Sequence, residues 1–330
     1  MNKISDKTTH LNSTCKICDN DKDNTVYSAK EMMYGFRDEF HYFQCQQCEC
    51  LQIGEFPENI SKYYPENYYS FNEYDGKKFK GLSGSIKRKK YASLITGSKS
   101  KQRIMRMFSG NGNYTIFQGL DVDKNTKILD VGCGNGKSFL YPLAEIGFRN
   151  IRGCDPYLKK SLSYENGLQI DKSNLFDIKG QWKIITYHHS FEHVPDPKEQ
   201  MKKVYELLEP GGVCILRVPT VSSYAWEHYR TNWAQLDAPR HYFLHSQKSM
   251  KMLGDLSNLE LYKNSYDSTH FQFTGSEKYI NDTALSKPRP KGLVNLIQRK
   301  MKKTQFKKKA KLLNKEGRGD QAAFFFRKKA

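Results

Sequence analysis

The sequence predicts an α/β protein with a mostly parallel sheet, preceded by a small cysteine-rich segment. Short apolar runs alternate with turns and helical patterns between residues 127 and 218, as they do in open α/β sheets. Two Cys-x-x-Cys pairs lie before residue 50. The 330 residues are enough for one large domain and one small domain.

The most informative stretch is residues 127–138, which reads KILDVGCGNGKS. Its apolar run at 128–131 predicts a buried parallel strand. Three glycines then let the backbone turn sharply and lie close against a ligand. They are Gly132, Gly134 and Gly136. Residues 137–146 can form a helix whose first amides point at the same ligand. Dinucleotide-binding enzymes share such a glycine-rich turn, so the turn alone does not identify the ligand.

The next elements narrow the choice of ligand. A second strand over 150–154 leads into Asp155, 19 positions after Gly136. A carboxylate at this point can accept hydrogen bonds from both hydroxyls of a ribose. The remaining apolar runs predict strands at 168–170, 183–187 and 213–218, with a helix at 197–208.

In this order and spacing, LDVGCGNG, CDP, HHSFEHVPDP and LLEPGGVCILRVP resemble class I S-adenosylmethionine (SAM) methyltransferases. The resemblance covers residues 127–218 and implies a Rossmann-like sheet with SAM as cofactor. It implies that Asp130 and the glycine loop hold the methionine part, with Asp155 on the ribose. Asn174 and Leu175 would frame the adenine, and His189 would contact SAM.

Cysteine spacing predicts a structural zinc ribbon over residues 1–56. The chain has eight cysteines and no signal-peptide core, which favours thiols or metal ligands over disulfides. Four of them form two pairs with 26 residues between: Cys15, Cys18, Cys45 and Cys48. Four thiolates close a tetrahedral Zn²⁺ site and leave no position for substrate. The alternatives are four unrelated buried thiols, or Cys50 in place of Cys48, although the Cys-x-x-Cys spacing favours Cys48.

A tyrosine-rich and basic connector is expected over residues 57–125. Its tract KYYPENYYSFNEY contains six aromatic side chains: Tyr63, Tyr64, Tyr68, Tyr69, Phe71 and Tyr74. They either pack the small domain on the large one or form a wall for a sugar or a base, because tyrosine offers a flat face and a hydroxyl. The order of ribbon, connector and SAM domain resembles sugar C-methyltransferases and methyltransferases of bacterial surface-polysaccharide gene clusters. That resemblance implies that the ribbon and the tract help to form the substrate cleft.

The same resemblance implies the catalytic residues. His241, in a substrate-side insertion at 222–245, matches the expected general base, and imidazole can take a proton near neutral pH. These enzymes usually carry an acid just before this histidine, whereas this chain has Arg240, which we expect to contact an anionic group such as a diphosphate. His193 matches a histidine that lines the active site, and Glu192 would orient it or cap the next helix. A structural role is the alternative for His241.

The charge of the chain is +19 and unevenly distributed. Residues 76–120 carry 11 Lys or Arg and no acid, and residues 287–315 carry 12 and no acid. In the second tract, Leu293, Ile297 and Met301 have the four-residue spacing of one helical stripe. A basic amphipathic helix can lie on an anionic membrane or follow phosphates, and a solvated lysine-rich helix is the alternative. The apolar run at 322–326 predicts the final strand of the sheet.

We therefore predict a SAM-dependent methyltransferase with its catalytic domain at residues 126–330. Its acceptor would be a carbon or an oxygen of a nucleotide sugar or surface-glycan precursor, and no catalytic metal is required. No apolar stretch reaches the ~20 residues of a membrane span, so we expect a cytoplasmic protein, docked at the inner membrane surface through its basic tracts.

Two other functions fit parts of the sequence. An RNA methyltransferase would use the zinc segment and basic tracts to bind its substrate. However, HHSF differs from the Asn/Asp-Pro-Pro-aromatic loop that methylates base amines, and Val218-Pro219-Thr220 lacks a thiolate that could attack a pyrimidine. Specific nucleic-acid binding is therefore not expected. The third interpretation is a non-catalytic scaffold. The intact glycines and Asp155 argue against this interpretation.

Overall fold

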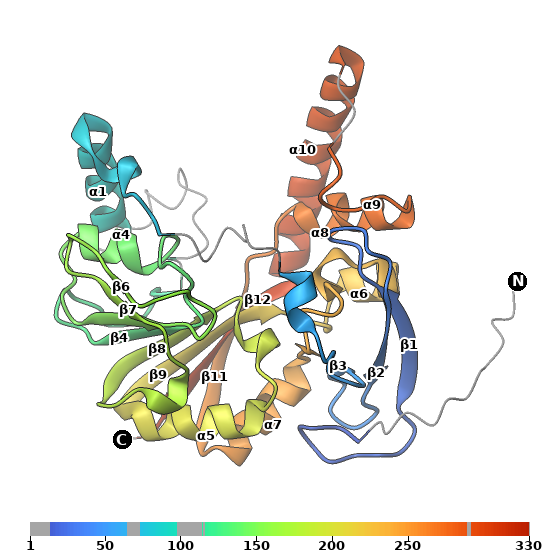
Figure 1. Ribbon diagram of the computed structural model, residues 1–330, viewed down its shortest axis with the longest axis horizontal. Helices are drawn as coiled ribbons and strands as arrows, with labels where there is room; N and C mark the ends of the chain where they lie inside the picture. Colours follow the sequence, from blue (N-terminus) through green and yellow to red (C-terminus); the bar gives the residue numbers. More distant parts are fainter. Residues whose placement is uncertain (1–13, 65–72, 98–113, 115, 289–291, 330) are drawn as a thin grey trace, which may run out of the picture.

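A mixed sheet of eight strands forms the centre of the protein, in the order β11-β12-β9-β8-β4-β5-β7-β6 (Figure 1). The computed structural model describes residues 14–64, 73–97, 114, 116–288 and 292–329. The strands of this sheet are β4 (Ile128–Val131), β5 (Ile151–Cys154), β6 (Leu162–Ser163), β7 (Gln169–Asp171), β8 (Trp182–His188), β9 (Leu208–Pro219), β11 (Leu259–Tyr266) and β12 (Gln321–Lys328).

The predicted α/β class and Rossmann-like sheet are confirmed. Strands β7, β5, β4, β8 and β9 run parallel, whereas β12 is antiparallel to both of its neighbours, β9 and β11. The predicted strands are all present, although β9 begins five residues before the predicted start at 213. The first helix, α4 (Leu140–Glu145), is shorter than predicted because the turns of the glycine loop continue through Phe139.

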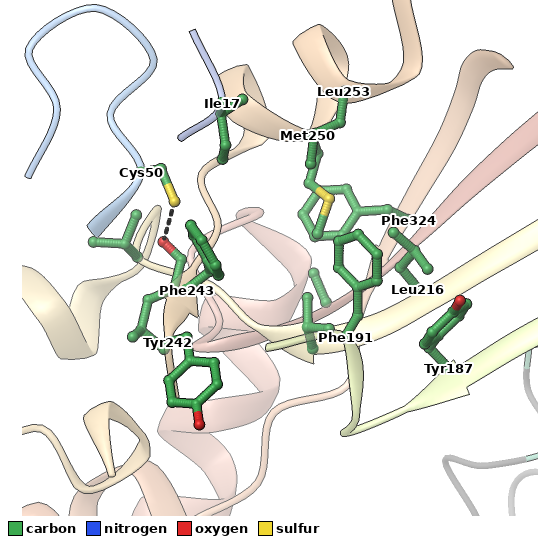
Figure 2. Packing of buried hydrophobic residues seen from close by; sticks show 14 of the residues in the cluster. Ile17, Cys50, Tyr187, Phe191, Leu216, Tyr242, Phe243, Met250, Leu253 and Phe324 are labelled. Atoms are coloured by element: carbon green, nitrogen blue, oxygen red, sulfur yellow. Dashed lines mark hydrogen bonds between the residues drawn. The ribbon is translucent and has the colours of Figure 1, made fainter. Parts of the chain in front are cut away.

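Helices cover both faces of the sheet. On one face, α4 and α1 (Gly81–Ile95) lie over a core that includes Ile128, Val213 and Ile215. On the other face, α5 (Pro197–Leu207) and α7 (Gln247–Leu256) cover the core that Figure 2 shows. Successive residues of β9 enter opposite cores, because side chains of a strand alternate between its two faces.

The cysteine-rich segment forms a second, four-stranded sheet in the order β1-β2-β3-β10. Its strands are β1 (Thr25–Lys30), β2 (Glu39–Gln44), β3 (Leu51–Ile53) and β10 (Phe243–Leu244). The last strand comes from the predicted insertion, where Phe243 pairs with Gln52 and Leu244 with Leu51. The ribbon is therefore completed by residues that lie 191 and 193 positions further along the chain than their partners, and it shares one core with the large sheet.

The remaining helices lie mainly in the second half of the chain. They are α6 (Tyr224–Tyr229), α8 (Phe271–Thr274), α9 (Ser276–Ile280) and α10 (Leu293–Lys315). The 3₁₀ helices are η1 (Ile60–Tyr63), η2 (Lys77–Phe79), η3 (Leu175–Asp177), η4 (Phe191–His193), η5 (Arg230–Asn232) and η6 (Ala234–Leu236). The basic helix and the final strand are thus where the sequence predicts them. Among the helices in the described parts of the chain, none combines the length and hydropathy needed to cross a bilayer.

Candidate active site

The predicted cofactor loop lies at the carboxyl ends of β4 and β5. The amide of Gly132 donates to the carbonyl of Cys154 at 2.8 Å, and the amide of Gly134 donates to Asp155 Oδ2 at 2.8 Å. The other oxygen of Asp155 accepts from the amide of Tyr157 at 2.9 Å. The buried Asp155 side chain therefore stabilises the loop through two hydrogen bonds. Each of its oxygens keeps a second lone pair for the predicted contact with a ribose.

Two positions in this loop require glycine. Gly132 has a φ of 67°, and a Cβ there would lie 2.5 Å from Ser190 Cβ. Gly136 has a φ of 68°, and a Cβ there would lie 2.7 Å from Ile170 Cδ1. Both separations are far shorter than van der Waals contact, so the loop can pack this closely only without side chains.

Asp130 is buried between β4 and β8. Its Oδ1 accepts a hydrogen bond from Thr186 Oγ1 at 2.8 Å, and its exposed fraction is 2%. Burial raises the pKa of Asp130 to about 8, because the charged carboxylate is disfavoured away from water. Asp130 therefore links β4 to β8 by a hydrogen bond directly before the glycine loop, and burial disfavours its ionised form.

The predicted adenine residues have structural partners of their own. Asn174 Oδ1 caps η3 by accepting from the amides of Phe176 and Asp177, at 2.8 and 3.3 Å. The side chain of Leu175 is fully buried in the core. Their predicted contact with adenine would thus involve mainly the backbone. Phe176, which the sequence analysis did not single out, is 52% exposed and is the available aromatic surface of this loop.

His189 is held in a defined tautomer. Its Nε2 lies 2.8 Å from Arg217 Nη1, and Arg217 is anchored by Asp267. A guanidinium can only donate, so Nε2 accepts and the ring proton is on Nδ1. That proton faces Glu192 Oε1 at an N–O distance of 3.6 Å.

The structure brings both predicted catalytic histidines together with Glu192. The rings of His193 and His241 meet edge to face, with centroids 4.8 Å apart. Their Nδ1 atoms lie 2.7 Å from the carbonyl of Arg240 and 2.8 Å from the carbonyl of Gln235, respectively. Carbonyls only accept, so each Nδ1 carries a proton and each Nε2 keeps its lone pair in the neutral ring.

Glu192 is the unusual member of this group. It is fully buried, and neither carboxylate oxygen has a hydrogen-bond partner in the described part of the structure. Burial raises the pKa of Glu192, but the neighbouring histidines lower it more, to about 2. The cap of the next helix is Asp196, which accepts from the amide of Glu199, so the capping alternative for Glu192 is wrong.

The group has two chemical capacities. Ligand atoms of Glu192, His193 and His241 all lie within 4.8 Å of one another, and two imidazoles with a carboxylate are donors that divalent transition metals accept. A lone pair on imidazole beside a carboxylate is also the arrangement of a general base. We call Glu192, His193, His241 and Asp237 the candidate cluster.

Arg240 does not have the expected role. Its side chain is 1% exposed, and its guanidinium pairs with Asp237 at 2.6 and 2.9 Å and with Glu31 at 3.1 Å. A further N–H donates to the carbonyl of Tyr63 at 3.2 Å. The predicted contact with a diphosphate is therefore wrong, because these donors already have buried partners.

Asp237 supplies the acid that the sequence lacks directly before His241. Asp237 Oδ2 lies 3.8 Å from His241 Nε2, and Glu192 Oε1 lies 3.9 Å from the same atom. Burial raises the pKa of Asp237, but the Arg240 guanidinium lowers it more, so the carboxylate stays charged. Two carboxylates thus face the expected base.

The aromatic tract divides into packing and site residues. Tyr63 is buried and donates to Asp38 at 2.7 Å, and Tyr74 packs edge to face on Tyr141. Tyr64 instead has its hydroxyl 3.4 Å from His193 Nδ1, and its ring stacks on Tyr157 with centroids 6.2 Å apart. We call Tyr64 and Tyr157 the aromatic wall. Tyr68, Tyr69 and Phe71 lie outside the described residues.

The four predicted zinc ligands form one cluster. Cys15 Sγ lies 3.5 Å from Cys48 Sγ, Cys18 Sγ lies 3.4 Å from Cys45 Sγ, and all four atoms lie within 4.8 Å of one another. Thiolates bound to one zinc ion are ~3.8 Å apart in a tetrahedron with Zn–S bonds of about 2.3 Å. Cys50 lies outside this set, with Sγ 3.5 Å from the carbonyl of Leu244 (Figure 2).

Two equal turns carry these cysteines. In segments 15–20 and 45–50 the first amide donates to the last carbonyl at 2.9 Å. Asp19 and Glu49, at corresponding positions, have positive φ angles of 58° and 62°. Gln52 Nε2 donates to Cys15 Sγ at 3.1 Å, as suits a negatively charged sulfur. The donor set, its spacing and its turns therefore fit a zinc ion.

Comparisons with known proteins agree with the fold. Residues 101–264 match a family model described as a methyltransferase domain, which begins inside the predicted connector. A ubiquinone biosynthesis O-methyltransferase of Psychrobacter arcticus is 36% identical over 109 residues, or 27% of this chain and 39% of that protein. The Caulobacter enzyme of the same name is 28% identical over 127 residues, or 35% of this chain and 48% of that protein. The chain thus spans less than half the length of these relatives.

Three solved structures align with parts of this chain at low sequence identity. StiE O-MT residues 961–1257 align at a TM-score of 0.41 with 10% identity, over 76% of this chain and 82% of that one. Mycolic acid cyclopropane synthase CmaA1 aligns at a TM-score of 0.43 with 14% identity, over 65% of this chain and 82% of that one. A SAM-dependent methyltransferase from Mesorhizobium loti aligns at a TM-score of 0.42 with 12% identity, over 66% of this chain and 100% of that one.

The raised pKa of Asp130 predicts a pH-dependent stability. The folded state binds this proton more tightly than the unfolded state, so the stability contribution of Asp130 is lost as pH rises from about 4 to about 8, by up to about 1.4 kcal/mol per pH unit. Asp130→Asn cannot ionise, and should gain free energy of unfolding relative to wild type over this range. Urea unfolding at pH 5, 6, 7 and 8 measures the difference. A difference that is the same at every pH would contradict the assignment.

The buried Arg240 ion pairs predict a second stability effect. Glu31→Gln removes one of the two carboxylates that neutralise the buried Arg240 guanidinium. The free energy of unfolding should therefore fall by about 3 kcal/mol. Lys198→Met breaks the exposed ion pair with Asp19 and should cost less than about 1 kcal/mol. Urea unfolding at pH 7 compares the two variants, and an equal loss would show that the buried pair has no special role.

Proposed function

We propose that this chain, whose residues 101–264 are a SAM-dependent methyltransferase domain, methylates a sugar-containing acceptor with His241 as general base. The observation that carries the proposal is the position of His241 Nε2. This atom keeps its lone pair and faces the carboxylates of Glu192 and Asp237. The ring of His241 also contacts His193, which lies after β8 and next to Tyr64 of the aromatic wall. Substrates of open α/β sheets bind at the carboxyl ends of the strands.

The chain's own residues would prepare the acceptor atom. The Gln235 carbonyl fixes the ring of His241 through Nδ1, so Nε2 points in one direction. As Nε2 takes the acceptor's proton, the imidazolium would gain attraction from Glu192 and Asp237, at 3.9 and 3.8 Å. SAM, when bound, supplies a methyl group that is already electrophilic. The remaining task of the protein is to align acceptor and methyl group for in-line transfer.

His193 would position the acceptor rather than take its proton. Burial and the neighbouring His241 lower the pKa of His193, which keeps this ring neutral. The neutral ring offers Nε2 as an acceptor for a hydroxyl of the substrate, while Nδ1 stays bonded to the Arg240 carbonyl. Two fixed acceptors 4.8 Å apart between ring centroids suit a polyhydroxylated substrate.

The aromatic wall supports a ring-shaped acceptor. Tyr157 is 56% exposed, and the nearly parallel ring of Tyr64 reaches His193 through its hydroxyl. Stacked tyrosines offer a flat apolar face with a polar tip, which fits the apolar face of a sugar. The sequence resemblance to sugar C-methyltransferases supports the same class. The O-methyltransferase relatives favour one second candidate, an intermediate of ubiquinone biosynthesis.

The deciding experiment supplies isotopically labelled SAM with four separate acceptor pools. These are nucleotide sugars, lipid-linked glycans, intermediates of ubiquinone biosynthesis, and total RNA. Mass spectrometry then locates the added methyl group on carbon or oxygen. Label in either sugar pool supports the proposal, label only in the quinone intermediates supports the second candidate, and label only in RNA contradicts both.

Replacing the expected base gives the sharpest mutational prediction. His241→Ala should lower kcat about 10²-fold or more and leave the Kd for SAM unchanged, because the ring takes a proton but does not hold the cofactor. Initial rates and calorimetry of SAM binding measure both effects. His228→Ala is the control, since His228 lies on the exposed side of α6, and it should leave kcat unchanged. Unchanged turnover in His241→Ala would remove this residue as the base.

We also propose that the four-cysteine cluster holds one structural Zn²⁺. Cys48→Ser should lose that ion and lower the melting temperature by several degrees, because folding of the segment depends on the metal. Cys50→Ser should retain it, because Cys50 lies outside the cluster. Metal content by mass spectrometry and thermal unfolding test both variants. Retention of the ion in Cys48→Ser together with its loss in Cys50→Ser would assign the fourth ligand to Cys50.

A further inference from the structure

Helix α10 exposes apolar side chains on the face that points away from the protein. Phe306, Ala310 and Leu313 lie on its inner face, and Ala310 and Leu313 are buried. Ile297, Met301 and Leu312 lie on the opposite side, with exposed fractions of 50, 62 and 55%. At 100° per residue, these three positions fall within one stripe of the outer surface.

Lysines surround this stripe. Lys300, Lys308, Lys311 and Lys315 belong to the same outer face and are exposed. Within the described residues, no ion pair joins any of these four to an acid. The helix as a whole carries nine Lys or Arg and no Asp or Glu. The outer face of α10 is therefore both apolar and strongly positive.

A second basic helix projects in the same direction. In the view of Figure 1, α1 at the left edge of the molecule and α10 nearer its middle both extend upward from the body of the protein. Leu82 and Ile86 of α1, one turn apart, are 88 and 69% exposed. Lys87, Lys89 and Lys90 follow them directly, without an acid between residues 76 and 120. The two helices thus repeat one combination of exposed apolar side chains and positive charge.

We propose that α1 and α10 dock the protein on the surface of a bilayer rich in anionic phospholipid. Lysines would attract the head groups, each by about 1 kcal/mol near the surface, while the apolar side chains enter the boundary with the acyl chains. Attraction to nucleic-acid phosphates would need the lysines but not Ile297, Met301, Leu82 or Ile86. The exposed apolar residues therefore favour a membrane over RNA. This inference does not depend on the identity of the acceptor.

Vesicle flotation of the full chain tests the proposal. Vesicles of 70% phosphatidylcholine and 30% phosphatidylglycerol should bind the protein, and vesicles of pure phosphatidylcholine should bind it at least tenfold more weakly. Binding should weaken as salt rises from 0.1 to 0.5 M, because the lysine contribution is screened. Equal binding to both kinds of vesicle, or to neither, overturns the proposal.

Two sets of variants separate the apolar from the charged contribution. Ile297→Ser with Met301→Ser keeps every charge and should weaken vesicle binding at least tenfold. Lys300→Gln with Lys308→Gln and Lys311→Gln should do the same. The matched control, Lys22→Gln with Lys159→Gln and Lys179→Gln, makes the same change of net charge at exposed sites elsewhere and should bind within twofold of wild type.

The apolar variant also distinguishes a membrane from RNA. All of the substituted side chains are exposed, and circular dichroism confirms that each variant is folded. If the serine variant binds vesicles as tightly as wild type, the apolar face has no role and the proposal fails. If wild type binds a 20-nucleotide RNA but no vesicle, and the serine variant binds this RNA equally well, the helices serve a nucleic acid and the proposal is overturned.

Discussion

The buried guanidinium of Arg240 is the interaction on which the candidate site depends. It joins Glu31 of the ribbon, the carbonyl of Tyr63 in the connector and Asp237 of the insertion. The carbonyl of the same residue accepts the hydrogen bond that orients His193. One residue therefore joins the three segments that surround the candidate cluster, and it also precedes His241 directly in the chain.

Burying these charges is costly, and the structure compensates with hydrogen bonds. A buried ion pair repays its desolvation only when the remaining donors and acceptors are satisfied. Glu31 meets this condition, since it also accepts from the amides of Tyr34, Gly35 and Phe36 at 2.9 to 3.0 Å. Glu192 does not, because it is buried with no hydrogen bond from a described residue. The two buried carboxylates therefore differ: Glu31 is fully hydrogen-bonded within the fold, whereas Glu192 receives no hydrogen bond from a described residue.

The sequence predicts the parts of the molecule that have local signatures. The strands follow from apolar runs, the cofactor loop from its glycines, and the cysteine cluster from its paired spacing. The partners of Arg240 have no such signature, because Glu31 lies 209 positions away and Asp237 precedes it within an irregular loop. For the same reason the sequence predicts neither the pairing of β10 with β3 nor the exposure of Phe176 beside the buried Leu175. Long-range contacts of single residues leave no periodic pattern to read.

The four-cysteine cluster and the expected base are connected through the backbone of the insertion. Cys48 and Cys50 lead directly into β3, whose partner strand is β10. The amide of Ile53 donates to the carbonyl of Tyr242 at 2.9 Å, and the hydroxyl of Tyr42 donates to the carbonyl of His241 at 2.8 Å.

Two successive carbonyls, those of His241 and Tyr242, are thus held by the ribbon rather than by the methyltransferase sheet. A general base must lie within hydrogen-bond reach of the proton it takes, so a displacement of about 1 Å is enough to impair it. The ribbon therefore fixes the backbone of the residue that we propose as the base, without contributing a reacting group of its own.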